Sequence, residues 1–239
     1  MNKLLIDAIN FSNEKAVLFK FESRSKLAAY SMGIYCTLIE LSESFSKLVE
    51  SQCYSGSLSV YRTFLENYVD LQNLVNNEHY VNQLDYDNCR QKKHNLEAAQ
   101  NDNPYLKSIK KYAIDELPKL DIEIAELKGN SDFKVLSTIK GKFQLAGMDK
   151  EYSGLYPLLS AESHCSLEAI FSRHFEKCTE SDEVKISINN KDNLPDYDFY
   201  LITMTRYLIF SGQLISDLLD GQQRIDFLEK REEIALSVK

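Results

Sequence analysis

The sequence is poor in the residues that turn or break a chain, with 8 Gly and 4 Pro among 239 residues. A fold with many tight turns or glycine-rich phosphate loops requires more of both. Neither a Gly-x-Gly-x-x-Gly sequence nor a Walker sequence occurs, which excludes the common nucleotide-binding loops. We therefore expect long helices joined by few connections.

Long apolar runs are also missing. The run Leu4–Ile6 is too short for the apolar core of a signal peptide, and no segment approaches ~18 uninterrupted apolar residues, so we expect no membrane span. The formal charge of −8 argues against a generally basic, nucleic-acid-coating surface. Five cysteines at irregular spacing are typical of a reducing compartment, which predicts a cytoplasmic protein.

Apolar residues recur every three or four positions along much of the chain, which indicates amphipathic helices. Ser23 or Ser25 is expected to cap the helix whose apolar stripe begins at Leu27. Pro118 is expected to interrupt a later helix, and Ser153 is a possible cap for the one after Gly154. Helices are predicted over residues 27–52, 56–76, 78–99, 104–129, 133–143, 154–171 and from about 196 onward.

The segment 178–197 departs from this pattern because it is acidic and then alternates in polarity, with a short strand expected at 184–188. The prediction is an all-α fold: a single helical bundle of long antiparallel helices over residues 1–239, with a small acidic loop or hairpin insertion near 178–197. Residues 77–130 are expected to form a lid or subdomain of the bundle.

Two polar rows lie on the shoulders of apolar helix faces. At 100° per residue, Tyr156, Ser160 and His164 fall on one line, and Arg62 and Glu66 are i, i+4 neighbours on another helix. If these helices pack shoulder to shoulder, the rows form one partly buried network, because such groups are costly to bury unless they satisfy one another. A solvated ion pair, worth ~0.3–0.5 kcal/mol, and a structural hydrogen-bond seam are the alternatives to a ligand-binding or catalytic site.

These residues carry a resemblance. The Arg-x-x-x-Glu sequence of Arg62 and Glu66, followed later by the Tyr-x-x-x-Ser-x-x-x-His sequence of 156–164, resembles an uncharacterised group of bacterial helical proteins. That group is distantly similar to the HEPN (higher eukaryote and prokaryote nucleotide-binding) superfamily. The resemblance implies a helical bundle that acts as a binding or regulatory module in bacterial stress or phage defence.

The sequence departs from the ribonucleases of that superfamily, which carry Arg, four to six residues, and then His on one helix. Here Arg90 and His94 are separated by three residues, and Arg173 and His174 are adjacent. We therefore expect no ribonuclease activity of this kind.

Basic side chains gather in two neighbouring helices. If these helices form a hairpin, the basic residues make a local positive stripe that could contact RNA or nucleotide phosphates; solvated helix faces are the alternative. The residues are Arg90, Lys92, Lys93 and His94, then Lys107, Lys110 and Lys111.

Metal-binding spacings are missing. His164, Cys165, His174 and Cys178 lie near one another in sequence, but no Cys-x-x-Cys or His-Glu-x-x-His occurs. We expect neither a metal site nor a cofactor.

Three functions follow: a binding or regulatory protein, an enzyme acting on RNA or a nucleotide through Arg62, Glu66 and His164, or a structural protein that dimerises. An enzyme requires the polar rows to open onto a cleft, whereas a structural seam is closed by packing. Apolar residues within the charged C-terminal stretch need cover from the first helix or from a second subunit, which predicts a homodimer that involves this helix. These residues are Ile225, Phe227, Leu228, Ile234 and Leu236.

Overall fold

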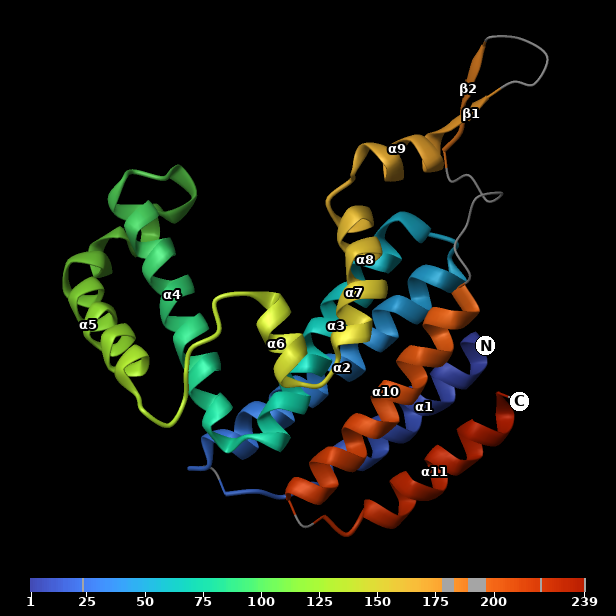
Figure 1. The fold of residues 1–239 in the computed structure, drawn as a ribbon, viewed down its shortest axis with the longest axis horizontal. Coiled ribbons are helices and arrows are strands. Elements are labelled where there is room, and N and C mark those ends of the chain that lie inside the picture. The colour runs from blue at the N-terminus through green and yellow to red at the C-terminus, as the bar shows by residue number, and fades with distance from the viewer. Residues whose placement is uncertain (23, 178–182, 189–196, 220, 239) are drawn as a thin grey trace. The chain divides into compact units, whose positions relative to one another are not determined.

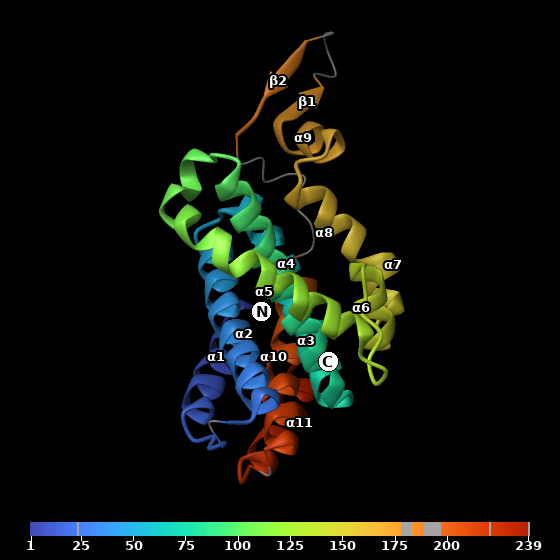
Figure 2. The same ribbon diagram turned by 90° about the vertical axis from the view of Figure 1, so that its left-hand side faces the viewer.

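The computed structural model describes residues 1–22, 24–177, 183–188, 197–219 and 221–238, and these are mainly helical (Figures 1 and 2). The described strands form one antiparallel pair, β1 (Phe175–Lys177) and β2 (Val184–Ile186). The predicted all-α fold with a small hairpin is confirmed for this part of the chain; most of the acidic insertion, 178–182 and 189–196, lies outside it.

The helices follow one another closely along the chain. They are α1 (Asn2–Ala16), α2 (Lys26–Glu50), α3 (Tyr54–Asn76), α4 (Val81–Gln100), α5 (Lys110–Gly129), α6 (Ile139–Leu145), α7 (Asp149–Gly154), α8 (Tyr156–Ser163), α9 (Leu167–His174), α10 (Tyr197–Leu218) and α11 (Arg224–Ser237), with 3-10 turns at Glu78–Tyr80 and Pro104–Ile109.

The chain forms two compact units. The first comprises residues 1–75 and 142–239, in which α1, α2, α10 and α11 pack against one another as a bundle. The second comprises residues 76–141 and consists mainly of the α4–α5 hairpin. Its small core contains Cys89, Leu96, Ala113 and Leu120.

Aromatic rings fill the core of the first unit. The fully buried Tyr61 of α3 meets Tyr200 of α10 edge to face, with the ring centroids 5.0 Å apart. Gly212 allows α10 to approach α11 closely, because a Cβ at this position would lie 2.1 Å from the Phe227 ring and 2.6 Å from the Tyr35 hydroxyl oxygen. The resulting contact holds the last helix against the bundle.

The C-terminal helix is covered in part by the protein's own first helix. Phe227 and Ile234 are buried, and the Phe227 ring lies 5.2 Å from that of Phe11 on α1. The other large apolar residues that were expected to need cover, Ile225, Leu228 and Leu236, are exposed. The homodimer stays a prediction, since α11 already has partners within its own unit.

In the described part of the chain, four helices end at a residue in the left-handed conformation, and three of these residues are not glycine. The chain therefore has more connections between helices than its low glycine content predicted. In each case the next backbone N–H donates to the carbonyl five residues earlier, which forms a Schellman motif. The left-handed residues are Gln52, Asp102, Gly147 and Cys165, with φ of 58°, 59°, 69° and 49°. The closing bonds are Cys53 to Leu48 (2.8 Å), Asn103 to Ala98 (3.1 Å), Met148 to Phe143 (2.9 Å) and Ser166 to Ala161 (2.9 Å).

The predicted continuous helix over 154–171 was wrong for this reason. α8 ends at Ser163, Cys165 turns the chain, and Ser166 starts α9 by accepting a hydrogen bond from the Ala169 N–H. Ser153 is not the cap of α8, whose N-cap is Leu155.

Other helix boundaries agree with the prediction only in part. Ser25 does cap α2, with its hydroxyl oxygen 3.2 Å from the Ala28 nitrogen, while Ser23 lies outside the described residues. Pro118 lies inside α5 without ending it, and the exposure of Ile114 allows the carbonyl that loses its partner to be hydrated. The helix expected over 133–143 begins only at Ile139. Neither α1 nor β1 was predicted.

Candidate functional site

Two helices of the first unit bring the predicted polar rows together. Arg62 and Glu66 are one turn apart on α3, so their side chains share a face. Tyr156 is the first residue of α8, and His164 is its C-cap. We call Arg62, Glu66, Tyr156 and His164 the polar cluster.

The hydroxyl of Tyr156 connects the two charged groups of the polar cluster. It donates to Glu66 Oε1 at 2.7 Å and accepts from Arg62 Nη2 at 2.8 Å. The Arg62 guanidinium also lies over the Tyr156 ring, 5.1 Å from its centroid, which adds a cation–π contact. A single side chain of α8 therefore holds both charges of α3.

The guanidinium of Arg62 contacts every other member of the cluster. Its Nε lies 3.1 Å from Glu66 Oε1, close enough for an ion pair, although the buried N–H is not directed at this oxygen as a hydrogen bond. Its Nη1 lies 3.1 Å from His164 Nε2. Because a guanidinium can only donate, a hydrogen bond here requires His164 to accept at Nε2.

Ser160 does not contribute its hydroxyl to these contacts. Its backbone carbonyl accepts from the His164 N–H at 3.0 Å. The hydroxyl that contacts Arg62 and Glu66 belongs instead to Tyr156, whose longer side chain reaches α3. The structure thus brings together four of the five residues that the sequence singled out.

Burial decreases across the cluster from Tyr156 to His164. Tyr156 is 7% exposed, the side chains of Arg62 and Glu66 are 22% and 32% exposed, and His164 is exposed. Burial, together with the carboxylate of Glu66, raises the pKa of Tyr156 against the opposing effect of Arg62. Burial lowers the pKa of Arg62, but Tyr156 and Glu66 outweigh it and raise the pKa overall. Arg62 therefore stays charged and Tyr156 stays neutral near pH 7.

Two further aromatic rings, which were not predicted from the sequence, pack against Tyr156 of the polar cluster. The ring of Tyr152 on α7 stacks on that of Tyr156 with centroids 5.5 Å apart, and Phe143 on α6 contacts both rings. These residues lie on three short helices, so no single periodic pattern relates them. Their shared aromatic character within fourteen residues of sequence was the available signal.

The basic residues of the second unit are partly neutralised. Lys93 lies 2.5 Å from Asp121, and Lys110 lies 2.5 Å from Asp102. Arg90 lies over the Tyr86 ring, with the guanidinium carbon 5.7 Å from the centroid. Of the remaining candidates, Lys92 and Lys107 are exposed and Lys111 lies over the Tyr112 ring. These ion pairs weaken the positive stripe that RNA binding would require.

Among the described residues, no group of three or more His, Cys, Asp or Glu side chains is placed to hold a metal ion. In the same part of the chain, no helix combines the length and the apolarity needed to cross a bilayer.

Comparison with known proteins yields one family. No curated protein and no solved structure matches the chain. A family model described as a family of unknown function (DUF5677) matches residues 28–184. The matched span contains the whole polar cluster and the basic residues of the second unit, and it covers more than half of the chain. The chain therefore belongs to this family of unknown function.

Proposed function

We propose that the chain is a binding or regulatory module that docks a protein partner through the segment after α7. This segment consists of α8, α9, β1, β2 and the described residues that follow β2 to Ile188, and we call it the distal arm. Both views show α9 and the β1–β2 pair extending beyond α8, away from the α3–α10 helices (Figures 1 and 2).

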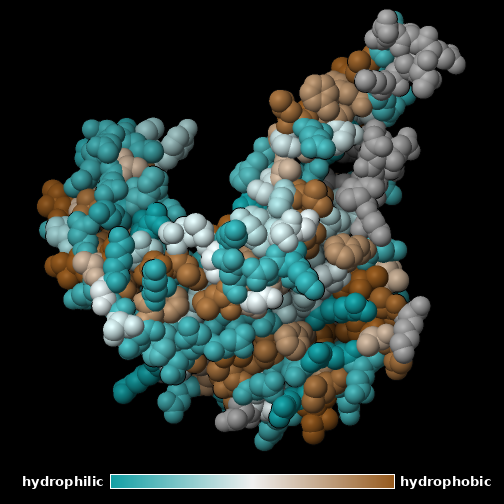
Figure 3. Space-filling view, in the orientation of Figure 1, coloured by the Kyte–Doolittle hydropathy of each residue, from teal (hydrophilic) through white to brown (hydrophobic). Residues whose placement is uncertain are grey.

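The observation that carries this proposal is the exposure of large apolar side chains on the distal arm. Figure 3 shows apolar residues at the surface of this part of the chain. An isolated two-stranded pair is marginally stable in water, and clustered exposed apolar residues mark interaction surfaces. The exposed residues are Leu158 (61%), Leu167 (73%), Phe171 (58%), Val184 (55%), Ile186 (73%) and Ile188 (82%).

The polar cluster acts in this proposal as a latch between α3 and the distal arm. Tyr156 and His164 are the first residue and the C-cap of α8, and both contact Arg62. Fixing both ends of α8 fixes the direction in which α9 and the strands leave it. In this proposal the partly buried charged network orients the distal arm relative to α3.

The same contacts disfavour catalysis at the polar cluster. The proton of Tyr156 is held by Glu66, and the raised pKa of Tyr156 keeps the phenol neutral. The Nε2 lone pair of His164 faces Arg62, so this nitrogen cannot accept a substrate proton while the contact persists. An enzyme acting on RNA or a nucleotide is the alternative function; it requires this contact to open.

A second copy of the chain is the partner that we propose for the distal arm. The described hairpin has two strands, so each strand has one edge without a described neighbour, and a twofold copy presents the same edges in reverse. We extend the proposal to bacterial stress or phage defence, and to a cytoplasmic location, only through the resemblance and the composition described above.

Sedimentation of two matched variants tests the proposal. Leu167→Asp with Phe171→Asp places two charges on one face of α9, and Ile225→Asp with Leu236→Asp does the same on α11. We expect a dimer for the unmodified chain, a monomer for the α9 variant and a dimer for the α11 variant. A dimer lost only in the α11 variant would assign the interface to the C-terminal helix instead.

The enzymatic alternative has its own test. Incubation of the purified chain with a mixed-sequence RNA and with nucleoside triphosphates should leave both intact. Turnover that disappears in His164→Ala and in Glu66→Gln would favour the enzyme over the docking module.

A further inference from the structure

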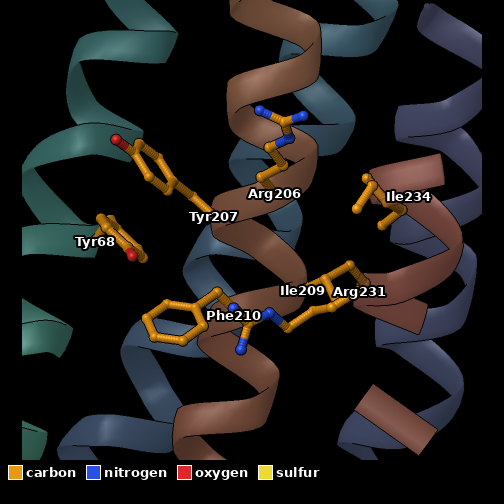
Figure 4. A pocket seen from close by; sticks show the side chains of 8 residues that line it. Tyr68, Arg206, Tyr207, Ile209, Phe210, Arg231 and Ile234 are labelled. Atoms are coloured by element: carbon orange, nitrogen blue, oxygen red, sulfur yellow. The ribbon is translucent and has the colours of Figure 1, made fainter. Parts of the chain in front are cut away.

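A cavity of about 300 Å³ opens between α3, α10 and α11. Tyr68, Tyr207, Ile209, Phe210 and Ile234 form its apolar and aromatic part, and Arg206 and Arg231 form its charged part (Figure 4). None of these residues belongs to the polar cluster or to the distal arm. We call it the α10–α11 cavity.

The aromatic part of the cavity is rigid. Tyr68 and Tyr207 are stacked with centroids 4.3 Å apart and planes 15° apart. Tyr68 accepts a hydrogen bond from Gln72 at 2.8 Å, and Tyr207 lies 3.4 Å from Glu151. Because both hydroxyls are engaged by these partners, the tyrosines line the cavity with their ring faces, alongside the aliphatic side chains.

The two arginines lie at different ends of the cavity. Figure 4 shows Arg206 on one side of the Ile209 position and Arg231 with Phe210 on the other. The guanidinium carbon of Arg231 lies 4.6 Å from the centroid of Phe210, and its Nη1 donates to Gln213. Both arginines keep N–H groups free to bind an anion, because a guanidinium has five. Within the described part of the chain neither arginine forms an ion pair with a carboxylate, although the formal charge of the chain is −8.

We propose that the α10–α11 cavity binds a small aromatic anion, with the ring on the floor formed by Phe210, Ile209 and Ile234 and the acid group held by Arg231. The carboxylate of Glu151 lies beyond the Tyr207 hydroxyl and repels an acid group at that end. The acid group is therefore oriented toward Arg231, at the Phe210 end of the cavity. A ring bearing a carboxylate or a phosphate fits, since guanidinium binds both in a bidentate manner.

Calorimetric titration of the full chain with two pairs of probes tests this assignment. Indole-3-acetate and phenyl phosphate are the anions, and 3-methylindole and phenol are their neutral counterparts. At least one anion should bind, with its neutral counterpart about tenfold weaker or more, because charge-assisted hydrogen bonds are the stronger kind. The stronger anion of the two identifies the acid group.

Single variants locate the site. Arg231→Gln should weaken binding of that anion about tenfold, and Arg206→Gln, at the other end of the cavity, should weaken it less. Arg224→Gln is the matched control on α11, because Arg224 pairs with Asp217 at 2.7 Å and does not line the cavity; it should leave affinity unchanged. Arg231 also packs on Phe210, so thermal unfolding of each variant is measured. If Arg231→Gln lowers stability, Arg231→Lys, which keeps the charge but not the bidentate contact, decides, and it should also weaken binding.

Three results would overturn the inference. The first is no binding of either anion at millimolar concentration. The second is equal affinity for the neutral counterparts, which would make the cavity merely apolar. The third is unchanged affinity in Arg231→Gln. None of these results bears on the distal arm, so the proposed function stands or falls separately.

Discussion

At the scale of single residues, the hydroxyl of Tyr156 is the contact on which the polar cluster depends most. In Tyr156→Phe the ring remains against Tyr152, but Glu66 loses a donor and Arg62 loses an acceptor in a partly buried position. We expect the free energy of unfolding in urea to fall by about 1–2 kcal/mol. Tyr152→Phe, which keeps the stacked ring and leaves the cluster's hydrogen bonds in place, is the control.

If Tyr156→Phe is as stable as the unmodified chain, the cluster does not fix α8 to α3. A double-mutant cycle with Glu66→Gln separates the hydrogen bond from the ion pair, because neighbouring groups are not additive.

Buried tyrosines also predict an alkaline limit of stability. Burial, with Glu151 adding to it, raises the pKa of Tyr207 from 10.0 to about 12, and burial likewise raises the pKa values of Tyr35 and Tyr68. Between pH 10 and pH 12 the unfolded chain has lost these protons while the folded chain holds them. The folded state then binds more protons, so stability is complete below about pH 10 and falls as pH rises.

Urea midpoints measured between about pH 8 and pH 11.5 check this expectation. Tyr207→Phe should make the decline less steep, since one of the shifted groups is removed. A midpoint that does not change above pH 10 would contradict the assignment of these phenols as buried and protonated.

Much of the polar cluster could be predicted from the sequence, and the one wrong member of the prediction, Ser160, has a definite cause. Arg62, Glu66 and His164 were placed on the shoulders of apolar faces, which the structure brings together. Ser160 was included because it falls between Tyr156 and His164 on the same line at 100° per residue. The choice between a serine and a tyrosine hydroxyl depends on how far each side chain reaches across a helix interface, which spacing alone does not encode.

At the scale of elements, the turn after α8 shows how a chain with few glycines still forms many connections. Cys165 takes a left-handed conformation, with φ of 49°, which costs a non-glycine residue about 1–2 kcal/mol. In Cys165→Gly this strain is relieved, so we expect a higher melting temperature with unchanged helix content. Cys165→Val should lower the melting temperature, because a β-branched residue fits this conformation poorly.

The control for this pair is Cys53→Gly, because Cys53 lies outside the left-handed positions and should not gain stability. Equal melting temperatures for Cys165→Gly and the unmodified chain would contradict the assignment of strain.

The apolar periodicity predicted the long helices α2, α3, α4 and α10. A residue other than glycine that adopts the left-handed conformation, however, cannot be recognised from the local sequence. The short helices after residue 130 were therefore the poorly predicted part.

At the scale of the whole molecule, the two units differ in the size of their cores. The second unit buries a small cluster between α4 and α5 and the ring of Tyr80 against Phe133, whereas the first buries many more large side chains. Among the latter are Tyr35, Phe45, Tyr61 and Phe64. Local stability follows buried apolar contact. We expect amide hydrogens of α4 and α5 to exchange faster than those of α2 and α10 in native-state hydrogen exchange; equal protection in all four helices would show that the units unfold together.

The contacts of Lys142 have a consequence for how the chain is assembled from its parts. Asn73 donates to the Lys142 carbonyl at 3.0 Å and the Lys142 ammonium lies 3.2 Å from Asp70, so the chain leaves the first unit and returns to it at neighbouring points. Residues 76–141 are thus an insertion closed at its base. Replacing them by a linker of about six residues should lower the entropic cost of loop closure by about 2 kcal/mol. The shortened chain is then expected to fold, and to melt no lower than the parent, as a free-standing bundle that retains the polar cluster.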